Sequence, residues 1–157
     1  MKNRLLFLTL ALTLTVPAIA LRAEPPPAGA APAAKEKDDE TELGRTMSKL
    51  NGAWRKLRKQ AADATANASS LELAATVKAA AEKAVTLEPA MAADKPAADR
   101  PAFIAAYQKQ MKDFIALADQ LAATFKANDN AAAQALIQKM GAAQKEGHKE
   151  FKKPDQH

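Results

Sequence analysis

Met47 and His148 are the two residues of this 157-residue chain whose side chains are best suited to bind a redox metal together. A thioether and an imidazole are the two axial ligands of many electron-transfer haems. The residues lie far apart in the sequence, so only the fold can bring them together. An up-down-up-down bundle of four helices would do so, because its first helix begins at the end where its last helix finishes.

Apolar residues recur every three or four positions in the first half of the chain, which is the spacing of amphipathic helices. The first such segment covers residues 39–63, and its apolar stripe is Leu43, Met47, Leu50, Trp54, Leu57 and Ala61. Ser69 and Glu72 have the spacing of a capping box and predict the start of a second helix. This helix should end before Pro89.

The second half of the chain predicts two further helices. A loop with one short turn near Met91 should precede the third helix, with Asp99 as its cap and Pro101 in its first turn. Its stripe is Ile104, Tyr107, Met111, Phe114, Ala118, Leu121 and Phe125. The residues Asn128, Asp129 and Asn130 form a short connection to a fourth helix, whose inner stripe is Ile137, Met140, Gln144, His148 and Phe151 and which Pro154 should stop. The predicted fold is an all-α, antiparallel up-down-up-down four-helix bundle over residues 39–153.

This arrangement predicts a haem site at one end of the bundle. Met47 would lie roughly 12 Å along the first helix and His148 roughly 6 Å from the end of the fourth, at about 1.5 Å per residue. A haem between them would enter edge-first, with its propionates toward water, and Tyr107, Met111 and Phe114 are candidate walls. Gly141 and Gly147 each cost about 1 kcal/mol in a helix. Close approach of a flat ligand would offset that cost, and close helix packing is the alternative.

The N-terminal residues have the features of a secretory signal. Lys2 and Arg4 precede an apolar run that is too short to span a bilayer, and a small-residue cleavage site follows. We therefore expect residues 1–20 to be removed on export to a bacterial periplasm, with cleavage after Ala23 as the alternative. Residues 21–38, rich in proline and alanine, should form a flexible tether, and residues 154–157 a tail.

Composition limits the classes of function. Without Lys2 and Arg4, 21 of the 23 basic residues remain against 18 acidic ones, so the net charge falls from +5 to +3. The sequence contains no basic stripe interleaved with aromatic residues, so nucleic-acid binding is not predicted. No membrane insertion is expected after cleavage of the signal. The chain has no cysteine, so any haem must be held non-covalently. We expect a monomer.

Two segments resemble the ends of the cytochrome b562 family: Glu42 to Asn51, which contains Met47, and Glu146 to Lys152, which contains His148. The similarity extends loosely over residues 39–152. It implies a periplasmic haem b protein in which Met47 and His148 ligate the iron and an unknown redox protein is the partner. Phe151 matches the aromatic residue that follows the ligand histidine, whereas Gly147 replaces a bulky aromatic residue.

Other interpretations remain open at the level of the sequence. A haem-free periplasmic bundle that serves as an interaction or stress-response module is the alternative, with Met47 and His148 as ordinary side chains. An enzyme is not predicted, because no paired carboxylates or nucleophile and base occur on facing helices; Asp113 and Asp119 should be solvated charges. Basic residues should ring the haem end and could steer an acidic partner: Arg45, Lys49, Lys145, Lys149, Lys152 and Lys153.

Overall fold

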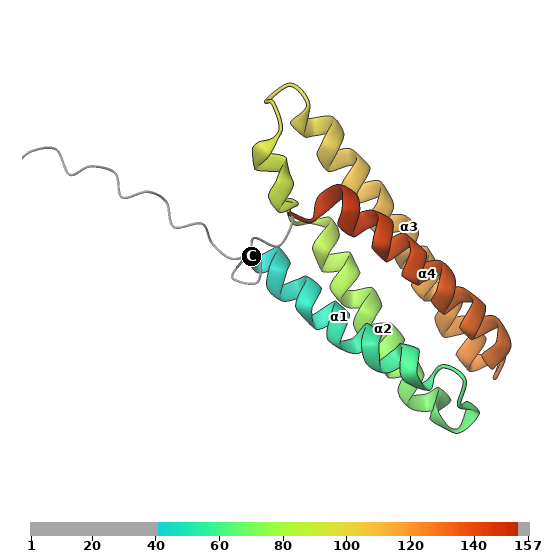
Figure 1. The fold of residues 1–157 in the computed structure, drawn as a ribbon. Helices are drawn as coiled ribbons and strands as arrows, with labels where there is room; N and C mark the ends of the chain where they lie inside the picture. The colour runs from blue at the N-terminus through green and yellow to red at the C-terminus, as the bar shows by residue number, and fades with distance from the viewer. Residues whose placement is uncertain (1–40, 154–157) are drawn as a thin grey trace, which may run out of the picture. The chain divides into compact units, whose positions relative to one another are not determined.

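The computed structural model describes residues 41–153 and contains four α-helices in this range. They are α1 (Glu42–Gln60), α2 (Asn67–Val85), α3 (Arg100–Lys126) and α4 (Asn130–Phe151), with 3₁₀ turns η2 (Ala64–Ala66) and η3 (Ala90–Asp94) between them. Consecutive helices run in opposite directions, so the start of α1 and the end of α4 lie at the same end (Figure 1). The predicted four-helix bundle is confirmed. The predictions for residues 1–20, 21–38 and 154–157 lie outside the described residues.

The core follows the apolar stripes that define the helices. Trp54, Leu57, Leu121, Phe125 and Met140 are all at most 1% exposed. Several buried alanines of α2 and α3 bring these two helices close together: Ala74, Ala80, Ala81, Ala84 and Ala118. Neighbouring helices pack along their length, except that α1 and α4 approach each other at few points. The bundle is therefore least tightly closed between its first and last helices.

The first two helices differ in extent from the sequence prediction. α1 begins at Glu42, because the Thr41 hydroxyl accepts a hydrogen bond from the Gly44 amide at 2.9 Å, and it ends at Gln60 instead of residue 63. The capping box at Ser69 is wrong, since α2 begins at Asn67 and the Ser69 hydroxyl donates to the Ala66 carbonyl. The η2 turn, which the sequence analysis missed, starts the second helix early.

The connection into α3 matches the prediction in part. The turn near Met91 is the 3₁₀ turn η3, and Pro101 lies in the first turn of α3, as predicted. Asp99 precedes the helix but makes no capping hydrogen bond. Its backbone is already helical, whereas a capping side chain needs an extended backbone to reach the first amides. Asp129 does cap α4, since its carboxylate accepts from the Ala132 amide at 2.9 Å.

An asparagine network closes the end of the bundle at which α2 begins. The side chain of Asn67, only 6% exposed, donates to the side-chain oxygen of Asn128 at 2.9 Å. Asn130 in turn donates to the side-chain oxygen of Asn67 at 2.9 Å and to the Ala61 carbonyl at 2.8 Å. Asn128 adopts a positive φ of 57°, which asparagine tolerates better than most residues. These contacts join the end of α1, the start of α2 and the turn between α3 and α4.

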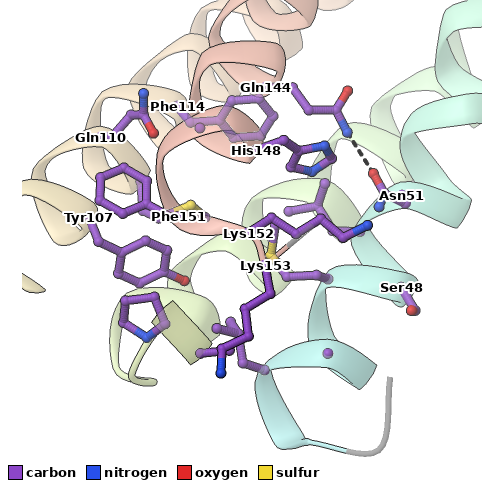
Figure 2. Close-up of a pocket in the computed structure, with 18 of the residues that line it drawn as sticks. Ser48, Asn51, Tyr107, Gln110, Phe114, Gln144, His148, Phe151, Lys152 and Lys153 are labelled. Atoms are coloured by element: carbon purple, nitrogen blue, oxygen red, sulfur yellow. Dashed lines mark hydrogen bonds between the residues drawn. The ribbon is translucent and has the colours of Figure 1, made fainter. Parts of the chain in front are cut away.

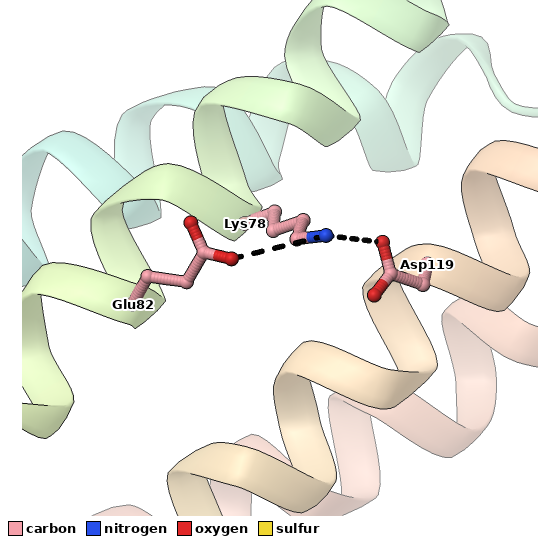
Figure 3. Close-up of polar contacts among 3 residues, drawn as sticks. All are labelled: Lys78, Glu82 and Asp119. Atoms are coloured by element: carbon pink, nitrogen blue, oxygen red, sulfur yellow. Dashed lines mark hydrogen bonds and ion pairs between the residues drawn. The ribbon is translucent and has the colours of Figure 1, made fainter.

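An ion pair on the surface links α2 and α3, and others lie within each helix. Lys78 of α2 lies between Glu82, at 3.8 Å, and Asp119 of α3, at 2.7 Å (Figure 3). The hydrogen bond to Asp119 raises the pKa of the Lys78 ammonium above its ordinary value. Asp113 pairs with Lys109 one turn earlier on α3. Both aspartates are thus exposed and paired with lysine, in agreement with their prediction as solvated charges.

No helix in residues 41–153 is long and apolar enough to cross a membrane.

Candidate functional site

A cavity of about 200 Å³ lies at the end of the bundle where α1 begins and α4 finishes. Residues of α1, α3 and α4 line it, together with Pro89 and Ala90 from the connection between α2 and α3. Its surface is mainly apolar. The cavity lies between α1 and α4, two helices that approach each other at few points.

Met47 and His148 both line this cavity, and both are half-buried. Met47 lies five residues from the start of α1 and His148 three residues from the end of α4, or roughly 7.5 and 4.5 Å at about 1.5 Å per residue. The later start of α1 makes these depths more similar than the sequence indicated. Figure 2 shows the His148 imidazole reaching from α4 toward α1. The structure thus brings the two donor residues to one cavity, and their role as ligands stays a prediction.

The other predicted site residues form the walls of the same cavity. Tyr107, Met111 and Phe114 come from successive turns of α3, and Phe151 comes from the last turn of α4. The Tyr107 and Phe151 rings meet edge to face, with their centroids 5.4 Å apart. On its inner side, Phe114 packs against Trp54 with a centroid distance of 6.3 Å. Such contacts hold the rings in fixed positions, so the cavity wall is preformed.

The polar group of Tyr107 is bound by α2. Its hydroxyl donates a hydrogen bond to the Ala84 carbonyl at the end of α2, at 3.0 Å. Burial raises the pKa of the Tyr107 hydroxyl to about 12, so the phenol stays neutral at physiological pH. The residue therefore supplies an apolar ring to the site and anchors α3 to α2.

A hydrogen bond that the sequence analysis did not predict spans the inner part of the cavity. The amide nitrogen of Gln144 on α4 donates to the side-chain oxygen of Asn51 on α1 at 2.6 Å (Figure 2). Asn51 follows Met47 by one helical turn, and Gln144 precedes His148 by one turn. The bond therefore joins α1 and α4 just inside the two donor residues. The sequence signal that could have predicted this bond is the presence of polar residues, Asn51 and Gln144, one helical turn from each predicted ligand.

Gly147 lies against a polar side chain of α3. A Cβ atom at Gly147 would lie 2.7 Å from the side-chain oxygen of Gln110, which also lines the cavity. A Cβ atom here would require the end of the flexible Gln110 side chain to shift, so the neighbouring helix favours glycine at this position without requiring it. Gly141 has nothing within 4 Å of an added Cβ, and nothing in the structure explains it.

The predicted ring of basic residues only partly surrounds the cavity. Lys152 and Lys153 line its mouth, and Lys153 pairs with Asp94 at 3.0 Å. The other four basic residues are exposed but do not line the cavity: Arg45, Lys49, Lys145 and Lys149. The mouth itself is therefore less basic than the sequence indicated.

The sequence model of the cytochrome b562 family matches residues 42–152, which include the whole bundle and every predicted site residue. The chain belongs to the cytochrome b562 family. Members of this family are haem b-binding electron-transfer proteins with a four-helix bundle fold. No curated protein and no solved structure gives a significant match to this chain.

The residues around the cavity are compatible with the haem of cytochrome b562. The group needs two axial donors, an apolar enclosure and an opening for its polar edge. Met47 and His148 supply the donor types from facing helices, and the aromatic rings of α3 and α4 supply the enclosure. Among residues 41–153, no cluster of three His, Asp or Glu side chains could hold a metal ion by itself. A donor set of one thioether and one imidazole suits a metal that is held mainly by its own macrocycle.

Proposed function

We propose that this chain is a periplasmic electron carrier in which the Met47 thioether and the His148 imidazole are the axial ligands of a non-covalently bound haem b. The observation that carries the proposal is that both side chains line one cavity, from the first and the last helix of the bundle. When bound, haem b supplies an iron atom that accepts and releases one electron. The protein's part is to bind this group, orient it and tune its potential.

Each part of the cavity has a defined task in this proposal. His148 would hold the iron through an imidazole nitrogen and Met47 through its thioether, a ligand that favours the reduced state and so would raise the reduction potential. Tyr107, Met111, Phe114 and Phe151 exclude water from the group. The chain has no cysteine, so attachment through thioether bonds is not available.

Absorption spectra of the purified protein after haem supply test the ligand assignment. The reduced wild-type protein should show a sharp low-spin b-type spectrum. Met47→Ala should make the iron high-spin or lower its potential, and His148→Ala should abolish tight binding. Met91→Ala and His157→Ala are matched controls, because Met91 does not line the cavity and His157 follows the bundle. Unchanged haem uptake in both ligand variants would refute the assignment.

Thermal unfolding gives an independent test of haem binding. A ligand that binds only the folded state raises the unfolding temperature, so the holoprotein should melt above the apoprotein. The two ligand variants should lose this difference while the apoprotein itself remains folded. A wild-type protein that gains neither a spectrum nor stability from haem would instead favour a haem-free interaction module.

Export and oligomeric state are further parts of the proposal. We infer from the sequence features of residues 1–20 that the chain is exported and that these residues are removed. Mass spectrometry of the protein from the periplasmic fraction should show the processed N-terminus, and an unprocessed cytoplasmic chain would contradict this. We expect a monomer that meets its redox partner transiently, and sedimentation of the holoprotein measures this mass directly.

A further inference from the structure

After its first turn, which contains Glu42, the exposed side of α1 carries basic residues and no acidic ones. Between Arg45 and Lys59 the helix has six basic residues and no aspartate or glutamate, and all six are exposed: Arg45, Lys49, Arg55, Lys56, Arg58 and Lys59. On each of α2, α3 and α4, by contrast, both acidic and basic residues occur. Positive charge without negative charge beside it in the sequence is thus concentrated on α1.

Five of these residues also lack carboxylate partners within the part of the chain that the structure describes, and we call them the basic face: Lys49, Arg55, Lys56, Arg58 and Lys59. Three lysines on α2 and α3, by contrast, have carboxylate partners. Lys78 lies 2.7 Å from Asp119, Lys83 lies 2.8 Å from Glu42, and Lys109 lies 2.7 Å from Asp113. The basic face therefore carries a positive potential that neighbouring carboxylates do not neutralise, and it extends for about 15 Å along the helix at about 1.5 Å per residue.

The basic face has no apolar anchor. The large apolar residues of this stretch of α1, Leu50, Trp54 and Leu57, are all buried in the core. Protein–protein interfaces depend on buried aromatic and aliphatic side chains at their centre, and cations alone at a rim contribute little. Anionic bilayers, by contrast, attract clustered Lys and Arg through their diffuse surface potential, without insertion of apolar side chains. Charge complementarity without an apolar anchor therefore favours a lipid surface over a protein.

We propose that the basic face of α1 binds the anionic phospholipid headgroups of a membrane surface and so holds the bundle peripherally on the bilayer. Met47 lies in the cavity between α1 and α4, whereas the basic face covers the exposed side of the same helix. The two surfaces can thus act at the same time. The proposal does not depend on haem, since it rests on charge and exposure alone.

Co-sedimentation with phospholipid vesicles tests this proposal. The full chain is mixed with vesicles of equimolar phosphatidylglycerol and phosphatidylcholine, or of phosphatidylcholine alone, at an ionic strength of about 0.01 M, where charges are weakly screened. It should bind the anionic vesicles, release on transfer to about 1 M salt, and leave the neutral vesicles unbound. The decisive variant is Arg55→Gln, Lys56→Gln, Arg58→Gln and Lys59→Gln in combination, which should weaken binding at least about tenfold.

A matched variant separates the position of the charges from their number. Lys112→Gln, Lys126→Gln, Lys139→Gln and Lys145→Gln together remove four exposed cations from α3 and α4 and should retain most of the affinity. All chains share the same N-terminal segment, so any affinity of that segment for lipid cancels in the comparison. Circular dichroism and the haem spectrum should be unchanged in both variants, because the substituted side chains lie outside the core and the cavity.

Three results would overturn the proposal. They are equal vesicle binding by the basic-face variant and the wild type, an equal loss in the matched variant, and binding to polyglutamate without binding to anionic vesicles. The last result would identify an acidic protein as the partner. If the wild-type protein shows a normal haem spectrum but does not bind anionic vesicles, the membrane proposal has failed. If it binds the vesicles but shows no haem spectrum, the haem proposal has failed.

Discussion

Loss of the hydrogen bond between Gln144 and Asn51 should weaken haem binding as well as stability. This bond is a side-chain link between α1 and α4, two helices that otherwise pack against each other at few points. It lies one turn inside Met47 and His148. Without it, α1 and α4 should sample a wider range of separations. Part of the free energy of haem binding must then be used to restore the separation at which both donor residues face one cavity.

The size of the effect follows from the environment of the bond. Both side chains are half-buried and uncharged, so the partner that remains after Asn51→Ala or Gln144→Ala can reach water. Each substitution should therefore cost about 1 kcal/mol of unfolding free energy. In a domain of this size that lowers the melting temperature by about 4 °C. If the same free energy is lost from binding, the dissociation constant of haem rises about fivefold.

The assay combines unfolding of the apoprotein with haem titration. Trp54, the only tryptophan of the chain, lies in the core and reports unfolding by fluorescence. The double variant Asn51→Ala/Gln144→Ala completes a cycle and isolates the coupling between the two side chains. Asn67→Ala is the matched control, because it removes a buried amide network at the opposite end of the bundle, at a cost of about 1–3 kcal/mol.

The outcome for haem affinity decides the argument. Asn67→Ala should lower stability and leave the haem dissociation constant unchanged, whereas the Asn51 and Gln144 variants should change both. Unchanged or tighter haem binding in the Asn51 and Gln144 variants would refute the role of this bond in holding the cavity. Tighter binding in particular would mean that the bond must break before haem enters.

Two further predictions concern single residues near the site. Burial raises the pKa of Tyr107 to about 12, so between pH 10 and 12 the unfolded chain releases this proton before the folded chain does, and stability should fall as the pH rises. Tyr107→Phe should reduce this alkaline slope by up to about 1.4 kcal/mol per pH unit, measured by denaturant unfolding; an unchanged slope would show that Tyr107 titrates normally. Gly141→Ala should stabilise the protein by about 1 kcal/mol, since an added Cβ meets nothing within 4 Å. Gly147→Ala should gain less because Gln110 must move, and thermal melts in which Gly147→Ala gains as much as Gly141→Ala would contradict this reasoning.

Helical periodicity was sufficient to predict the fold and the general place of the site. The stripe through Leu50, Trp54 and Leu57 faces the core as predicted, because a helix buries the side on which its apolar residues repeat. The same rule placed Met47 and His148 on inward faces. The short turn before Asn130 required α3 and α4 to be antiparallel neighbours.

Polar contacts between distant segments were not predictable in the same way. Asn67 lies next to a serine-rich stretch that is typical of a loop, and its burial depends on Asn128 and Asn130, which lie about sixty residues later. Likewise, the pairing of Asn51 with Gln144 depends on the separation between α1 and α4. Periodicity gives the direction in which a side chain points but not the distance between two helices.

The position of the cavity follows from the connectivity of the bundle. At this end the chain continues directly from α2 through η3 into α3, so a covalent connection limits how far these two helices can separate. Within residues 41–153, α1 and α4 have no such connection at this end, and the hydrogen bond between Asn51 and Gln144 links them. Residues on the first and last helices can therefore move apart to admit a flat group without strain in any loop. Met47 and His148 lie on this pair of helices, whereas the asparagine network closes the opposite end and supplies stability at a distance from the site.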